Sequence, residues 1–133
     1  MYIIICLDDN NGLAFNHRRQ SQDRIVVEDI SKTVGKKKLW ITDYSRKLFQ
    51  AVSNLEISEN PKGQAKKGEY VFQELETLDT DDEQIEQFII YRWNRVYPAD
   101  VSVEIGAEWK LTETEEFPGF SHGKITKEIY CRE

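Results

Sequence analysis

The stretch MYIIICLDDNNGLAFNHRRQSQDR, from Met1 to Arg24, decides the fold. Tyr2 to Leu7 is a continuous apolar run, too short for a helix, and turn residues follow it from Asp8 to Gly12. This pattern predicts a buried strand that ends in a tight turn. A polar loop then leads into an amphipathic segment, Asp23 to Val34. Strand, polar loop and helix in this order are typical of an α/β ligand cleft, so we expect the loop to form one wall of any site.

The composition limits the class of protein. A chain of 133 residues with 39% apolar and 32% charged residues predicts one domain, residues 1–133, with a buried core. The net charge of −6 makes a nucleic-acid partner or a membrane surface unexpected, because phosphates would be repelled. No signal peptide and no apolar run near the ~18 residues of a membrane span are visible, so we expect a cytoplasmic protein. Cys6 and Cys131 have no partner at motif spacing, and we expect free thiols, no metal site and no cofactor.

The rest of the chain predicts alternating strands and helices. Ser21 or Asp23 caps a helix that Gly35 ends, with Val26, Ile30, Thr33 and Val34 as its buried stripe. Residues 85–97 fit either a helix that stops at Pro98 or a short buried strand. A capping box at Thr80 and Glu83 predicts one further helix start, and a helix is expected over Tyr44–Val52. The expected strands are Leu39–Ile41, Leu55–Ile57, Tyr70–Leu75, Val101–Ile105, Trp109–Phe117 and Ile125–Cys131.

Three segments resemble dihydrofolate reductases. IIICLDDNNGLAFN, from Ile3 to Asn16, looks like the start of that family, where an apolar strand runs into a D-x-x-N-G-I-G-x-N loop. EWKLTETEEFPGFSHGKITKEIYCR, from Glu108 to Arg132, is similar to the family's closing hairpin, and KKLWITDYS, from Lys37 to Ser45, to its second strand and next helix. The resemblance covers both ends of the chain well and the middle poorly. It implies an α/β fold whose mixed sheet is mostly parallel, has an antiparallel C-terminal hairpin and is flanked by helices, and it favours a strand over Phe88–Arg92.

The departures from that family affect its reductase site. Val26 aligns with the catalytic carboxylate, and Glu28 or Asp29 would need a two-residue shift to replace it. Asp43 stands where the family's G-R-x-T has an arginine, and it would repel a cofactor phosphate. The stretch Arg92-Trp93-Asn94 replaces the consecutive glycines that let a pyrophosphate touch the backbone. We therefore expect a domain that has lost reductase chemistry.

The resemblance also brings basic residues together. His17, Arg18, Arg19 and Arg24 in the first loop would face the segment Arg92 to Arg95 across the cleft. Arginine suits planar anions and an aromatic ring offers a stacking face. Alternatively, the arginines pair with Asp8, Asp9, Asp23 or Asp100 and hold loops in place. The predicted ligand-binding residues are Arg18, Arg19, Arg24, Arg92, Trp93 and Arg95.

Three functions remain open, and the sequence does not decide whether the protein is an enzyme. The first is a non-reductase dihydrofolate reductase-like domain that binds an anionic small molecule or nucleotide, or a protein partner. The second is a divergent NADPH-dependent reductase that uses Glu28 or Asp29. The third is a small metal-independent ribonuclease that uses His17, His122 and arginines. The chain is also similar to short bacterial proteins labelled ribonuclease Z, but it lacks the His-x-His-x-Asp-His cluster that such a zinc hydrolase needs.

Overall fold

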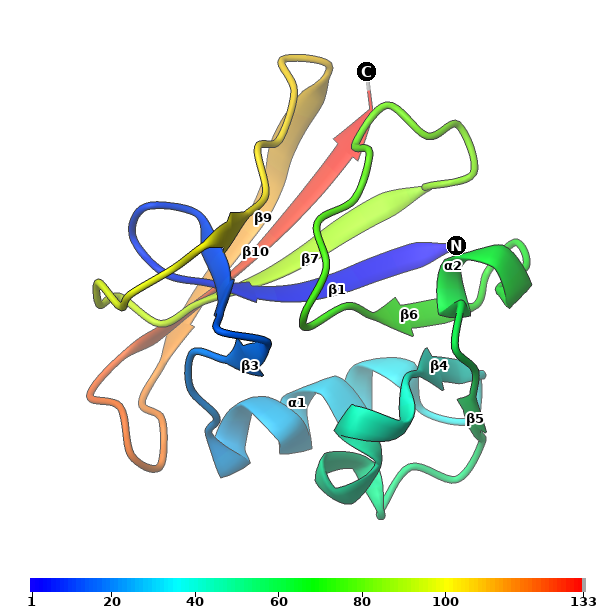
Figure 1. Ribbon diagram of the computed structural model, residues 1–133, viewed down its shortest axis with the longest axis horizontal. Coiled ribbons are helices and arrows are strands. Elements are labelled where there is room, and N and C mark those ends of the chain that lie inside the picture. The colour runs from blue at the N-terminus through cyan, green and yellow to red at the C-terminus, as the bar shows by residue number, and fades with distance from the viewer. Residues whose placement is uncertain (133) are drawn as a thin grey trace.

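A seven-stranded sheet forms the centre of the computed structural model, which describes residues 1–132 (Figure 1). The strand order is β5-β4-β6-β1-β7-β10-β9. The five strands from β5 to β7 run parallel, and β10 and β9 form an antiparallel hairpin at one edge. The strands are β1 (Tyr2–Leu7), β4 (Leu39–Ile41), β5 (Leu55–Ile57), β6 (Tyr70–Phe72), β7 (Gln87–Arg92), β9 (Trp109–Phe117) and β10 (Ile125–Arg132).

Smaller elements cover the two faces of this sheet. A second sheet of order β3-β2-β8 joins Arg18–Arg19, Gly12–Phe15 and Val101–Ser102. The helices are α1 (Arg24–Val34), the 3₁₀ helix η1 (Asp43–Phe49) and the short α2 (Pro61–Gln64). No helix within residues 1–132 is long and apolar enough to cross a membrane.

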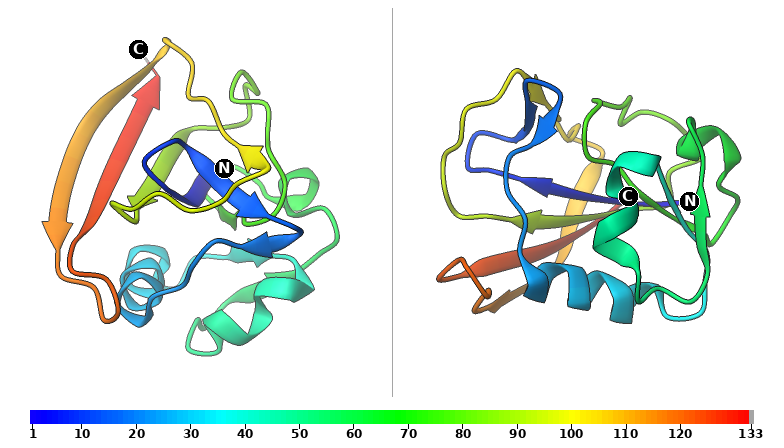
Figure 2. Two further views of the ribbon diagram at one scale, coloured as in Figure 1. Left: turned by 60° about the vertical axis from the view of Figure 1, so that its left-hand side comes forward. Right: turned by 60° about the horizontal axis from the view of Figure 1, so that its bottom comes forward.

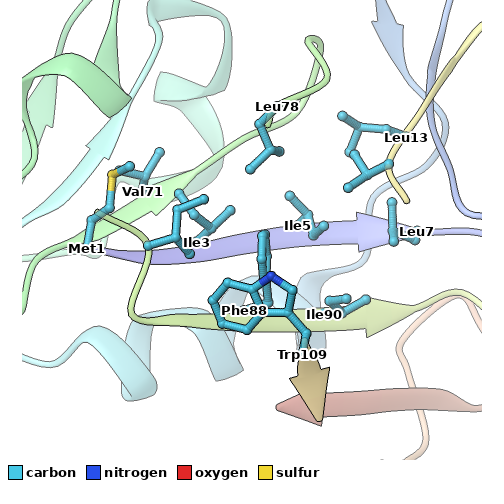
Figure 3. Close-up of a cluster of buried hydrophobic side chains, with 12 residues drawn as sticks. Met1, Ile3, Ile5, Leu7, Leu13, Val71, Leu78, Phe88, Ile90 and Trp109 are labelled. Atoms are coloured by element: carbon cyan, nitrogen blue, oxygen red, sulfur yellow. The ribbon is translucent and has the colours of Figure 1, made fainter. Parts of the chain in front are cut away.

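Strand β1 separates two apolar layers, because successive side chains of a strand point to opposite faces. Ile3, Ile5 and Leu7 pack with Phe88 and Trp109 on one face (Figure 3). Ile4, on the other face, belongs to the layer that α1 covers. These four side chains of β1, Ile3, Ile4, Ile5 and Leu7, are fully buried. The prediction of an interior first strand is confirmed, as is the antiparallel hairpin at the sheet edge.

Helix α1 follows the predicted pattern closely. Asp23 is its N-cap and accepts the N–H of Ile25, and Gly35 ends it with φ 59°, a conformation that glycine adopts without steric cost. Val26, Ile30 and Val34 are its buried residues. The helix therefore lies with one apolar stripe against the Ile4 face of the sheet.

Four predicted elements need correction. The helix expected over Tyr44–Val52 is the 3₁₀ helix η1, which buries Ser45 and Phe49 because Ser45 donates a hydrogen bond inward to Glu74. No helix starts at Thr80, whose hydroxyl donates to the carbonyl of Glu104 while residues 79–85 form turns. The two strands expected over Tyr70–Leu75 and Val101–Ile105 end early, at Phe72 and Ser102.

The topology places a crevice between β4 and β6. The chain leaves β4 through η1 on the α1 face, where Phe49 is buried. It leaves β6 over the opposite face, where Leu78 and Ile85 are buried. Two adjacent parallel strands whose connections leave in opposite directions open a crevice at their carboxyl ends, where α/β proteins bind ligands. The carboxyl ends of all five parallel strands meet at this edge.

Candidate functional site

The turn after β1 is built around the buried carboxylate of Asp8. It accepts the N–H groups of Asn10 and Gly12 at 2.8 Å and of Tyr97 at 3.0 Å, and the side-chain amide of Gln20 at 3.0 Å. Burial opposes its ionisation, but these donors outweigh burial and lower the pKa of Asp8. The Asp8 carboxylate therefore ties the first loop to the segment after β7, and within residues 1–132 it forms no ion pair with an arginine.

Arg19 is neutralised within the protein. Its guanidinium donates two hydrogen bonds to Glu74, at 2.7 and 3.0 Å, and lies 4.4 Å from the centre of the Tyr44 ring. Glu74 also accepts a hydrogen bond from the hydroxyl of Ser45. Arg19 and Glu74 are 22% and 8% exposed, so this is a largely buried ion pair that joins the first loop to β6 and η1.

Arg92 and Trp93 also have internal partners. Arg92 pairs with Glu128 at 2.8 Å and donates to the side chain of Asn11. Trp93 is 3% exposed and stacks on the His122 ring, with ring centres 4.6 Å apart. Arg19 and Arg92 thus pair with the glutamates Glu74 and Glu128, and not with the aspartates that the sequence analysis considered as partners.

The remaining predicted residues are exposed, and the six do not line one mouth. Arg24 lies over the Phe120 ring, with 4.0 Å from its guanidinium carbon to the ring centre. Arg18 and Arg95 are exposed. Arg19 and Trp93 line a shared cleft of only about 10 Å³, room for about one water. Ligand binding by these six residues stays a prediction, and Arg24 lies beside a large groove.

A polar cluster around Asp23 and His122 was not predicted. Asp23 Oδ2 lies 2.8 Å from His122 Nδ1, and the carboxylate accepts the backbone N–H groups of Phe120, Ser121 and His122. Burial opposes ionisation of Asp23, but these donors and the one at Ile25 lower its pKa far below the usual range. In both views of Figure 2 the loop between β9 and β10 reaches the start of α1, where this cluster lies. The residues are 99 positions apart, so no local pattern could have shown the pairing.

Two larger clefts of opposite charge flank η1. The β4–β6 crevice, about 480 Å³, is lined by Asp43, Glu59, Glu74 and Glu76 but by only one cation, Lys62. The α1–η1 groove, about 440 Å³, has Arg24 and Lys47 at its rim and an apolar lining of Val27, Leu48 and Phe120. Its one acid, Asp23, is 3% exposed and already hydrogen bonded.

The residues of a divergent reductase lie away from the crevice. Val26 is buried against the sheet. Asp29 accepts the Tyr91 hydroxyl at 2.6 Å and pairs with Lys127 at 2.8 Å, and Glu28 is exposed. The two acids line a separate groove with Glu115 and Phe117, on the side of α1 that faces the hairpin.

The two histidines of the ribonuclease hypothesis differ in their surroundings. His17 is exposed, with φ 60°, in the turn between β2 and β3. His122 is 6% exposed and bound to Asp23. Acid–base cleavage of RNA needs two groups that reach the same phosphate. His17 is exposed in a turn and His122 is buried against Asp23, so the two do not present such a pair.

Comparison with solved structures identifies the fold as that of dihydrofolate reductases. The dihydrofolate reductase from Enterococcus faecalis, solved in complex with NADP(H) and RAB-propyl, matches with a TM-score of 0.65. The match covers 98% of this chain and 95% of that one at 10% sequence identity, so it shows the fold alone. No protein-family model matches the sequence. No curated protein matches it either.

Proposed function

We propose that this protein is a non-reductase domain of the dihydrofolate reductase fold that binds a small anionic ligand in the α1–η1 groove. The observation that carries the proposal is the pair of exposed cations, Arg24 and Lys47, at the rim of an apolar groove in a chain of net charge −6. A protein with a net charge of −6 does not attract anions as a whole. A local pair of cations is therefore the feature that would select an anionic ligand.

The size and lining of the groove indicate the kind of ligand. A volume of about 440 Å³ lies within the range of small-molecule sites. Phe120 is 64% exposed, so its ring is open to an apolar or planar ligand body. Arg24 stacks on that ring and keeps guanidinium N–H donors for a phosphate or carboxylate. A nucleotide or an aromatic carboxylate has both features.

Lys47 supplies the second charge from another element. It is exposed on η1, and within residues 1–132 it has no ion-pair partner. Asp23 also lines the groove, but its oxygens are occupied by backbone N–H groups, which reduces its repulsion of an incoming anion. The two cations, one from α1 and one from η1, can therefore act on one ligand in the groove.

A thermal-shift screen with mononucleotides, folate and inorganic phosphate tests the proposal. A ligand at a hundred times its dissociation constant should add about 2.7 kcal/mol to the free energy of unfolding. Arg24→Ala and Lys47→Ala should each weaken that ligand about tenfold. Lys32→Ala is the matched control, because Lys32 is an exposed cation in the last turn of the same helix. If the control variant weakens binding as much as the other two, the ligand does not occupy the groove.

A further inference from the structure

Ser21 and Asp23, two positions apart just before α1, lie beside the ring of the distant His122. Ser21 Oγ is 3.0 Å from His122 Nε2, and His122 Nδ1 is 2.8 Å from Asp23 Oδ2. We propose that Ser21 is a nucleophile, His122 its general base and Asp23 the residue that positions the base, and that the three hydrolyse small activated carboxylic esters. The inference is independent of ligand binding in the α1–η1 groove.

The hydrogen bonds set the direction of proton transfer. Ionised Asp23 can only accept, so the proton of His122 is on Nδ1 and the lone pair of Nε2 points to Ser21. Backbone N–H groups of Phe120, Ser121 and His122 hold the aspartate, and Trp93 stacks on the imidazole with 23° between the ring planes. A nucleophile bonded to a base that a third group orients is the arrangement of serine hydrolases, recognised by geometry and not by fold.

The reaction needs only an ester and water. Ser21 Oγ attacks the carbonyl carbon and gives its proton to His122 Nε2. The bond from that carbon to the leaving oxygen breaks, and His122 passes the proton to the departing alcohol. Water then attacks the acyl-serine and gives a proton to His122, which returns it to Ser21 as the carboxylic acid leaves. The net change is ester plus water to acid plus alcohol.

The surroundings of Ser21 limit the substrate. Ser21 lines the small cleft that it shares with Arg19, Glu74 and Trp93, and this cleft has a volume of about 10 Å³. Because the cleft has room for only about one water, the acyl group and the leaving group of an ester would both lie on the solvent side of Ser21. Within residues 1–132, the backbone N–H of Gln22, the residue after Ser21, carries no hydrogen bond and would be free to donate to a developing oxyanion.

Tyr97 shares the base with Ser21. Its hydroxyl lies 3.1 Å from His122 Nε2, so two hydroxyl groups compete for one lone pair. Tyr97→Phe removes that competitor, and this variant should acetylate Ser21 at least as fast as the wild type does.

Turnover of p-nitrophenyl acetate by the full chain tests the proposal. We expect a mass increase of one acetyl group on the peptide that contains Ser21, and Ser21→Ala should lower the rate at least about a hundredfold. Ser53→Ala is the control, because the exposed Ser53 hydroxyl donates to the carbonyl of Gly35 and does not contact Asp23 or His122. His17→Gln removes the exposed histidine as a source of background hydrolysis.

The general base has its own readout. His122→Gly should lose the activity and regain part of it with added imidazole, which a merely structural histidine would not do. Mapping the acetyl group on the wild type alone is already a test. If the acetyl group is found only on residues other than Ser21, the proposal is wrong. It is equally wrong if folded Ser21→Ala keeps the wild-type rate.

Discussion

The β4–β6 crevice and the α1–η1 groove have nearly equal volumes, about 480 and 440 Å³, but opposite charge. Both adjoin η1, and the course of the chain sets where each one lies. The crevice follows from the strand topology and is lined by four acids and one lysine. The groove follows from the packing of α1 beside η1 and carries Arg24 and Lys47. The fold therefore sets where each cleft lies, whereas a few side chains decide which ligand it admits.

The two regions also differ in how firmly their acids are held. Asp23 in the groove is 3% exposed and capped by backbone donors, whereas the Asp43 and Arg46 side chains of η1 are 79% and 59% exposed. Asp23→Ala should lower the free energy of unfolding by about 3 kcal/mol, since it removes a helix cap and several hydrogen bonds to a charged group. Asp43→Ala should change it by less than about 0.5 kcal/mol. Urea denaturation of both variants at pH 7 measures the difference, and equal losses would contradict it.

The same aspartate predicts a pH dependence. The folded pKa of Asp23 lies far below its unfolded value of about 3.9. Its stabilising contribution is therefore complete above about pH 5 and is lost as the pH falls toward the folded value. Urea denaturation between pH 6 and about pH 3 should show a steeper loss of stability in the wild type than in Asp23→Asn. Parallel curves for the two proteins would mean that another group dominates.

The Arg19–Glu74 pair gives the next largest effect. Arg19→Ala leaves the carboxylate of Glu74 largely buried without its cation, and it should cost about 2 kcal/mol. Glu74→Gln in the Arg19→Ala background should restore part of that loss, because a neutral amide is less costly to bury than an unpaired carboxylate. A double-mutant cycle by chemical denaturation measures the coupling. Additive losses would show that the two side chains do not interact in solution.

Local patterns predicted the elements that local chemistry determines. The apolar run from Tyr2 to Leu7 identified β1, and the apolar stripe with Asp23 and Gly35 identified α1 with its caps. The helix expected over Tyr44–Val52 failed because Ser45, a small polar residue, turns inward to reach Glu74. Nothing near Ser45 in the sequence shows that partner, which is 29 positions away.

The site was less predictable than the fold for the same reason. The sequence singled out arginines, but which of them an acid neutralises depends on contacts made in three dimensions. Arg19 meets Glu74, which is 55 positions away, and Arg92 meets Glu128, which is 36 positions away. Arg24 has no carboxylate partner within residues 1–132 and lies at the groove.

The acidic lining of the crevice should exclude NADPH. Glu74 and Asp43 are paired with Arg19 and Arg46, but Glu59 and Glu76 line the wall without an ion-pair partner within residues 1–132, so phosphates would be repelled there. We expect isothermal titration at moderate salt to show no micromolar binding of NADPH. The double variant Asp43→Asn with Glu59→Gln should tighten any weak affinity by about 1 kcal/mol, or about fivefold. Micromolar binding to the wild type would show that the charge of the crevice does not decide its ligand.

The smallest effect separates an arginine that holds the structure from one that is free for a ligand. Arg24 contacts the exposed ring of Phe120 and no carboxylate within residues 1–132, so Arg24→Ala should cost only about 0.5 kcal/mol of stability. That is roughly a quarter of the loss expected for Arg19→Ala, although both residues belong to the same basic loop. Thermal and urea denaturation of the two variants side by side measure the ratio. If Arg24→Ala destabilises the protein as much as Arg19→Ala does, Arg24 is a structural residue, and the groove loses its main candidate for anion binding.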